Sequence, residues 1–204
     1  MALSNYTNIS SKLEEWLNRE GMSSIATNAE DFITLAQRTI TRDVRVPPME
    51  VMTDLTVTSG RATIPPAMLD VKEVIAFDGC TAWPVYRDTF AGVKNHRLQN
   101  AAGPRVFDTV AGNFEFGPQP SSGVTVTLVY YQELNFISPT VPENWFSKYA
   151  PELILYAALA EAAVFIKDTE LEAKYSEKYD KAREALRLQK DKAEHAGNLQ
   201  VTPR

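Results

Sequence analysis

The chain is poor in the residues that most enzyme chemistry requires. Its 204 residues include one cysteine and two histidines, and the single Cys80 cannot form a disulfide within the chain, which suits a reducing compartment. The sequence has no phosphate-binding glycine loop, no nucleophile elbow and no clustered Cys/His spacing of a metal site. His96 and His195 lie far apart, and the acidic residues are scattered rather than paired. We therefore expect a protein that is not an enzyme and needs no metal or cofactor.

Long apolar runs are missing as well. In the most apolar stretch, residues 144–168, the longest uncharged run extends from Leu153 to Ala160, and Glu161 then interrupts it. A membrane-spanning helix needs about 20 mostly apolar residues and tolerates charges near its middle poorly. The stretch therefore predicts a buried helix and no membrane segment. The N-terminus shows no basic region followed by an apolar run, so no signal peptide is expected.

Excess positive charge is also absent. The formal net charge of −5 gives the surface as a whole no attraction for nucleic acid. The local exception is a group of arginines, Arg38, Arg42 and Arg45, with Arg61 downstream. They suit the negative end of a helix dipole, or they form a basic strip that binds a neighbouring subunit or a polyanion. Aromatic residues are not interleaved with them, so a groove for single-stranded nucleic acid is poorly supported.

Helical periodicity is present at both ends of the chain. Residues 8–20 and 27–46 each carry one apolar stripe, and Pro47-Pro48 ends the second. The same pattern returns over residues 144–168 and 169–197. Neither pair of helices can cover its apolar stripe alone. We therefore expect a discontinuous α-helical bundle built from residues 1–48 and 138–195, followed by a flexible tail over residues 196–204.

Glycine and proline gather between these helical ends. Seven of the nine glycines fall between Gly60 and Gly123, and ten of the twelve prolines between Pro47 and Pro142. That density excludes long helices and favours short strands joined by turns. Alternating residues in 49–60 and 123–134 indicate two of these strands. The expected fold class is α+β: an α-helical bundle built from both chain ends with an inserted antiparallel β-sandwich or barrel-like module over residues 49–137.

Four aromatic residues of this β module leave one alternative function open. Carbohydrate-binding modules stack sugars on exposed aromatic rings, and the candidates here are Trp83, Tyr86, Tyr130 and Tyr131. Tyr130 and Tyr131, however, lie on a strand with regular alternation, which favours core packing. A carbohydrate-binding β module is therefore the less favoured interpretation.

Five segments in a fixed order resemble a known family. They are WLNRE (16–20), DFITLAQRTITRDVRVPPME (31–50), TIPPAMLDVKEV (63–74), the stretch from GPRVFDTV to VYYQEL (103–134), and PENWFSKYAPELILYAALAEAAVFIKD (142–168). In this order and spacing they resemble the tailed-phage head–tail adaptor, or connector, proteins. The resemblance covers nearly the whole chain.

The resemblance implies a virion structural protein without catalysis. In this family the subunits assemble, typically as twelve copies, into a ring below the portal protein. The ring extends the DNA channel for genome passage and offers a platform to a downstream tail or nozzle protein. Double-stranded DNA is expected to pass through the lumen without specific binding, because clustered Lys and Arg are what retain phosphates. The expected location is the head–tail neck of the virion, after synthesis in the host cytoplasm. A stopper or tail-completion neck protein is the related alternative.

The contacts of such a ring can be assigned to candidate residues. The segment 187–204 is free to order on a partner, so it is expected to dock on the portal. The candidate docking residues are Arg187, Leu188, Leu199 and Val201. The candidate subunit-interface residues are Arg38, Arg42, Arg45, Tyr175 and Tyr179. No catalytic, cofactor-binding or metal-binding residue is assigned.

Overall fold

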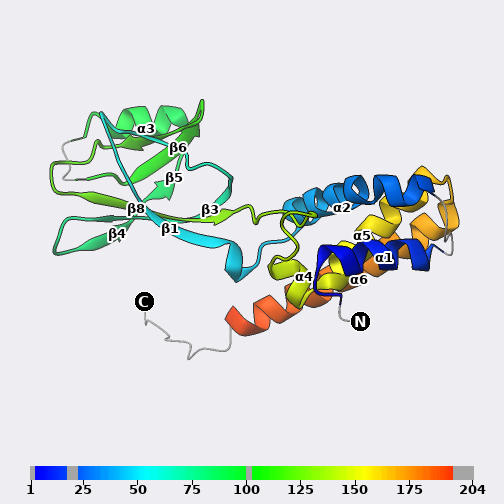
Figure 1. Ribbon diagram of the computed structural model, residues 1–204. Helices are drawn as coiled ribbons and strands as arrows, with labels where there is room; N and C mark the ends of the chain where they lie inside the picture. Colours follow the sequence, from blue (N-terminus) through cyan, green and yellow to red (C-terminus); the bar gives the residue numbers. More distant parts are fainter. Residues whose placement is uncertain (1–2, 18–22, 100–102, 195–204) are drawn as a thin grey trace. The chain divides into compact units, whose positions relative to one another are not determined.

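The computed structural model describes residues 3–17, 23–99 and 103–194 (Figure 1). These ranges contain six α-helices and two four-stranded β-sheets, so the predicted α+β class is confirmed. The sheets do not close into a barrel. The chain divides into two compact units: residues 1–46 with 134–204, called the helical unit below, and residues 47–133, called the β unit.

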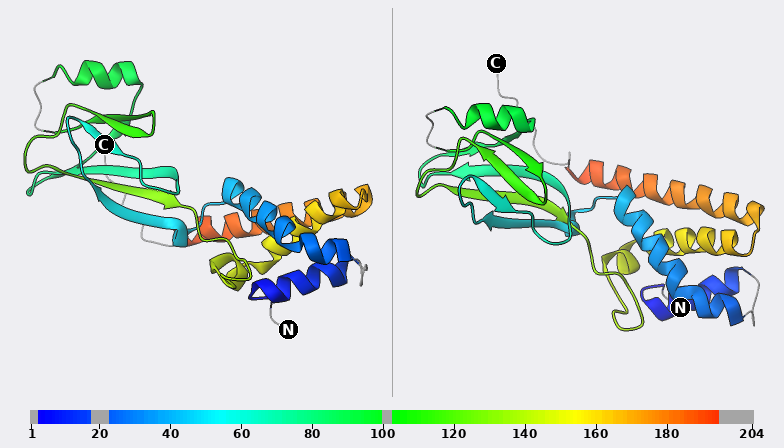
Figure 2. Two further views of the ribbon diagram at one scale, coloured as in Figure 1. Left: turned by 45° about the horizontal axis from the view of Figure 1, so that its top comes forward. Right: turned by 90° about the horizontal axis from the view of Figure 1, so that it is seen from above.

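The helical unit is organised around one apolar helix, α5. The helices of this unit are α1 (Tyr6–Trp16), α2 (Ser23–Asp43), α4 (Trp145–Tyr149), α5 (Pro151–Phe165) and α6 (Thr169–Glu194). Helix α5 packs against each of the other four (Figure 2). Its buried side chains therefore point in nearly every direction around the helix, among them Leu153, Ile154 and Leu159. The predicted buried helix is present. Because other helices cover α5 on most sides, it has no continuous polar face.

The segment predicted as one helix over residues 144–168 is broken in two. Ala150, between α4 and α5, has φ −145° and ψ 52°, outside the helical region. Proline disfavours the helical conformation in the residue before it and fits the first turn of the helix that follows. Pro151 therefore explains why α4 ends before Ala150 and why α5 begins at the proline itself. Asn144 begins α4 with a reciprocal capping box, in which its side chain accepts from the Ser147 N–H at 2.9 Å.

A buried glutamine of α2 forms two hydrogen bonds with Ile137, where the chain re-enters the helical unit. The amide oxygen of Gln37 accepts from the N–H of Ile137 at 2.7 Å, and its amide nitrogen donates to the Ile137 carbonyl at 3.2 Å. Both residues are buried, so the pair satisfies polar groups that would otherwise be costly to bury. The two hydrogen bonds therefore hold the start of the second part of the helical unit, residues 134–204, against α2.

The β unit contains two four-stranded sheets. Sheet A has the order β1-β8-β3-β4, all antiparallel, with β1 (Glu50–Leu55), β8 (Thr125–Gln132), β3 (Met68–Phe77) and β4 (Ala82–Pro84). Sheet B has the order β2-β7-β6-β5, with β2 (Arg61–Thr63), β7 (Asn113–Gly117), β6 (Val106–Val110) and β5 (Tyr86–Arg87). The 3₁₀-helix η1 (Pro47–Met49) leads into β1.

One strand pair departs from the expected antiparallel sandwich. Strands β5 and β6 pair in parallel, because the chain between them makes a crossover through α3 (Phe90–His96). Helix α3 packs on β6 and β7. Thr89 caps it by accepting from the Gly92 N–H at 3.2 Å.

The core of the β unit lies between the two sheets. Phe107, Phe114 and Phe116 of sheet B pack with Val126 and Leu128 of sheet A. The rings of Phe107 and Phe114 meet edge to face, with centroids 5.8 Å apart. Because side chains alternate along a strand, Glu115 and Gly117 of β7 point to the opposite face, beneath α3. Gly117 is required there, since a Cβ atom would lie 2.4 Å from the Val93 carbonyl oxygen.

Candidate functional site

The end of α2 and the second half of α6 line a groove on the helical unit. The groove has a volume of about 480 Å³ and is lined by Asp43, Val44, Arg45, Arg183, Glu184, Leu186, Arg187, Lys190 and Asp191. Both acidic and basic side chains line its walls, together with Val44 and Leu186. A groove of this kind can accept a segment of another protein that carries both charges and an apolar side chain.

Asp43 organises one wall of the groove. Its Oδ2 accepts hydrogen bonds from the Tyr179 hydroxyl at 3.0 Å and from Nη1 of Arg183 at 3.1 Å. Arg183 also lies 3.1 Å from Asp180. Burial, followed by the charge of Asp43, raises the pKa of the Tyr179 hydroxyl above its ordinary value. The hydroxyl therefore stays protonated at neutral pH and keeps donating to Asp43.

Two arginines of α2 share a face, and a third follows the helix at the groove. Arg38 and Arg42 are four residues apart on the helix and so share a face, whereas Arg45 lies beyond the end of the helix at Asp43. Arg38 and Arg42 are exposed, and Nη2 of Arg42 donates to Thr39 Oγ1 at 3.2 Å. Nη1 of Arg45 donates to the carbonyl oxygens of Thr41 and Val44. Arg45 thus caps the carbonyl end of α2, while the other two present their charge to solvent.

The candidate residues of α6 lie in two different environments. Arg187 lines the groove, with Nε 3.5 Å from Glu184, and Leu188 beside it is half exposed. Tyr175 and Tyr179 are buried, and the Tyr175 hydroxyl donates to the Trp16 carbonyl at 3.3 Å. The two tyrosines therefore make their main contacts within the helical unit, which leaves little of either ring for a second subunit. Leu199 and Val201 lie outside the described residues.

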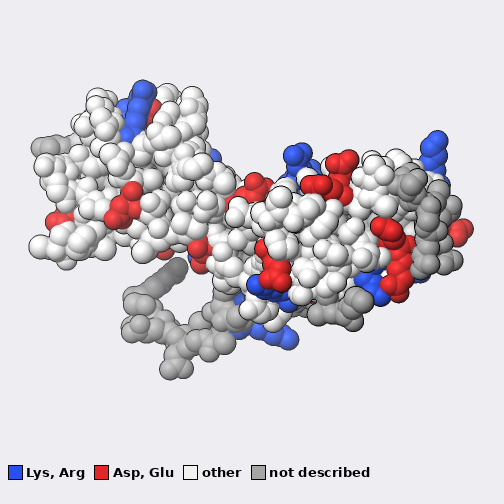
Figure 3. Space-filling view, viewed as in Figure 1, with Lys and Arg blue, Asp and Glu red and all other residues white. Residues whose placement is uncertain are grey.

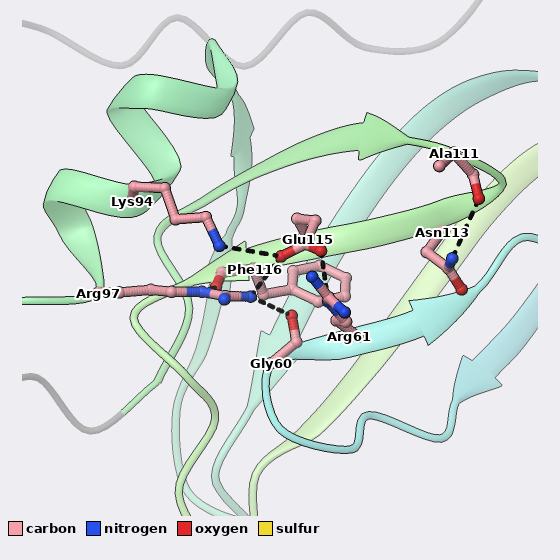
Figure 4. Close-up of polar contacts among 8 residues, drawn as sticks. All are labelled: Gly60, Arg61, Lys94, Arg97, Ala111, Asn113, Glu115 and Phe116. Carbon is pink, nitrogen blue, oxygen red and sulfur yellow. Dashed lines mark hydrogen bonds and ion pairs between the residues drawn. The ribbon is translucent and has the colours of Figure 1, made fainter.

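The β unit contains a second polar cluster, centred on Glu115 (Figure 4). The side chain of Glu115 is only 4% exposed. Its carboxylate lies 2.5 Å from Nε of Arg61, 2.7 Å from Nη2 of Arg97 and 3.9 Å from Nζ of Lys94. Arg97 also donates to the carbonyl oxygens of Gly60 and Phe116, each at 2.9 Å. The cluster therefore fastens α3 and the turn before β2 onto β7.

Sequence reasoning missed the Glu115 cluster. The available signal was a single carboxylate in the strand Asn113-Phe114-Glu115-Phe116, where an alternating pattern predicts a side chain on the face opposite the two phenylalanines. That face is buried only because α3 covers it. The positions of the cations depend on this tertiary placement, and no local pattern predicts them.

Neither cluster is arranged for catalysis. Within the described ranges every buried side-chain nitrogen and oxygen has a hydrogen-bond partner, and no group of three or more His, Cys, Asp or Glu side chains is placed to hold a metal ion. The carboxylates of Asp43 and Glu115 are each occupied by cations or hydroxyl donors. What the two clusters can do is fix elements in place and offer charge to a partner.

The four aromatic candidates for sugar stacking do not form a platform. Tyr130 and Tyr131 are buried and Tyr86 is exposed. Trp83 is half-buried and donates from Nε1 to the Pro104 carbonyl at 2.7 Å. Tyr130 belongs to the core between the sheets, as its place in an alternating strand predicted. A shared stacking platform would need these rings exposed side by side, so this arrangement gives the carbohydrate hypothesis no support.

The fold defines the class of protein: an α+β chain in which a helical unit from both ends carries an inserted two-sheet unit. Across the described residues, no helix is both long and apolar enough to cross a bilayer. A family model described as SU10 adaptor protein matches residues 4–203. The chain therefore belongs to the SU10 adaptor protein family and is a phage adaptor structural protein, which confirms the resemblance noted from its motifs. A search of curated proteins found no match.

Proposed function

We propose that this protein is the subunit of a ring that joins the portal protein to the tail and extends the DNA channel. The observation that carries the proposal is the match to the adaptor family over residues 4–203. Copies of the chain, typically twelve in such rings, would pack side by side in the neck of the virion, and a downstream tail or nozzle protein would bind the ring. The chain acts by binding and carries out no reaction.

The portal contact is assigned to the end of α6 and the groove beside it. Arg187 and the half-exposed Leu188 lie close to the end of the described part of the helix. An apolar side chain flanked by charges suits a docking contact, because the apolar group gains by burial while the charges select the partner. The mixed charges that line the groove around Arg187 support the same assignment.

The exposed arginines of α2 are assigned to contacts between subunits. Arg38 and Arg42 are exposed at the surface of the helical unit, and a neighbouring copy with a formal charge of −5 offers many carboxylates. The same net negative charge suits a channel through which DNA slides, since retention of DNA requires clustered cations facing the phosphates. Two arginines that are paired with a neighbour's carboxylates no longer attract DNA.

Electron microscopy of the protein mixed with its portal tests the proposal. The expected result is a ring of the full-length protein on the portal, and the absence of a ring would refute the proposed function. A variant that lacks residues 187–204 keeps Tyr175 and Tyr179, whose rings pack within the helical unit, so it should remain folded by circular dichroism. We expect this variant not to bind the portal. Normal portal binding by the truncated protein would refute the docking role of the segment.

A further inference from the structure

The outer face of sheet A is acidic. Residues paired directly across an antiparallel sheet share a face, and the register places Met52 opposite Val129 and Asp54 opposite Thr127, on the side away from the core. The charged residues that this register places on the outer face are Glu50, Asp54, Asp70 and Glu73. Lys72 joins the same face by its ion pair with Glu50 at 2.7 Å. Four carboxylates thus share the face with one cation.

The opposite side of the β unit, around α3, carries more cations than carboxylates. Arg61, Lys94 and Arg97 surround the carboxylate of Glu115, which is buried beneath them. The register places Asp108 directly opposite Glu115, and Arg87 lies 4.0 Å from Asp108. The Arg61 side chain is 59% exposed and that of Lys94 is 43% exposed. Asp88 lies at the other end of the helix, where it accepts from the Thr89 N–H. In Figure 3 Lys and Arg side chains rise over α3 with an acidic side chain beside them, whereas Asp and Glu side chains lie over the strands of sheet A.

Each of the two faces also exposes large apolar side chains. On sheet A these are Met52, which is 73% exposed, and Phe77. Beside the basic cluster they are Leu98, which is 87% exposed, and Phe90. Apolar groups with charged groups around them are typical of a protein interface, in which burial gives affinity and complementary charge gives orientation. The acidic face of sheet A is not suited to bind a copy of itself, because its carboxylates would then meet.

From these faces we infer that the β units of neighbouring copies bind front to back, with the acidic face of sheet A on one copy against the α3 face of the next. The two faces lie on opposite sides of the two-sheet layer, so one copy can hold two neighbours at once. Contacts between two different faces of the same chain close into a ring when the rotation between copies allows it. This inference rests on the proposed ring and assigns the β unit a share of its subunit interface.

Thiol cross-linking between two single-cysteine variants tests the orientation. In a background with Cys80→Ser, one variant carries Met52→Cys and the other Leu98→Cys. Both positions are exposed, so neither change should disturb the core. Rings are assembled on the portal from a mixture of the two variants and treated with a short thiol–thiol cross-linker. We expect a cross-linked dimer in the mixture and none when either variant is assembled alone.

The outcomes separate this inference from the proposed function. Rings that give the mixed dimer support both. Rings that form but give only self-pairs, or no cross-link, overturn the front-to-back contact and leave the ring itself standing. If the unmodified protein forms no ring on the portal, the proposed function fails and the inference fails with it.

A charge reversal tests the role of the acidic face. Glu73→Lys in the Met52→Cys variant reverses one charge on the outer face of sheet A, and we expect the mixed dimer to be lost. Glu30→Lys, at an exposed position of α2, makes the same change in net charge on the helical unit and should leave the dimer in place. An undiminished dimer with Glu73→Lys would overturn the assignment of charge complementarity. Thermal unfolding of both variants checks that each is folded.

Discussion

Leu153 is the residue whose substitution most directly tests the architecture of the helical unit. Its side chain is fully buried in α5, and α5 packs against every other helix of that unit. Replacing a buried leucine by alanine costs about 2–5 kcal/mol, because apolar contacts are lost and a cavity remains. Leu153→Ala is therefore expected to reduce the free energy of unfolding by an amount in this range and to leave the fold intact.

Leu153→Asp should have a larger effect. The loss of apolar burial, about 1.5–3 kcal/mol, is joined by the cost of an unpaired buried carboxylate, which is several kcal/mol. The sum approaches the whole stability of a typical domain, about 5–15 kcal/mol. We therefore expect this variant to lose the helical unit altogether, and not merely to stop assembling.

The assay is urea denaturation followed by far-UV circular dichroism, with tryptophan fluorescence as a second probe. Val164→Asp is the matched control: it lies on the same helix but is exposed, and a carboxylate near a helix C-terminus costs only about 0.3–1 kcal/mol. A folded Leu153→Asp protein with the helical content and unfolding midpoint of the wild type would refute the placement of α5 at the centre of the unit.

Two further predictions concern the polar clusters. Glu115→Gln keeps the size of the side chain and removes its charge, so we expect the β unit to lose about 1.5–3 kcal/mol, the contribution of hydrogen bonds to charged groups. Asp108→Asn, in a longer and more exposed contact with Arg87, should cost less than about 1 kcal/mol; equal losses in urea denaturation would contradict the role given to Glu115. The pKa of Tyr179 is raised by burial and by Asp43, whereas an unfolded tyrosine titrates near about pH 10. Above that pH the unfolded chain binds fewer protons than the folded chain, so the free energy of unfolding should fall as pH rises, and less steeply in Tyr179→Phe. Identical slopes in the two proteins, measured by denaturation at several alkaline pH values, would show that the hydroxyl is not held as described.

The sequence determined where helices and strands form. Spacing of apolar residues is a local property, so it located the helices at both ends, the strand with alternating Val126, Leu128 and Tyr130, and the apolar helix α5. Proline chemistry is local as well, although its full consequence at Pro151, a break into two helices, became visible only in the backbone of Ala150. The order of five segments was enough to indicate the adaptor family.

The tertiary structure alone decided which charged groups meet. Arg45 and Arg187 line one groove because α2 ends beside the second half of α6, and Arg61 meets Glu115 because β2 pairs with β7 in one particular register. It also decided that Tyr175 and Tyr179 are buried within the helical unit. Pairing energies of this kind depend on distances between residues remote in the chain, and such distances are fixed only when the sheets and helices have packed.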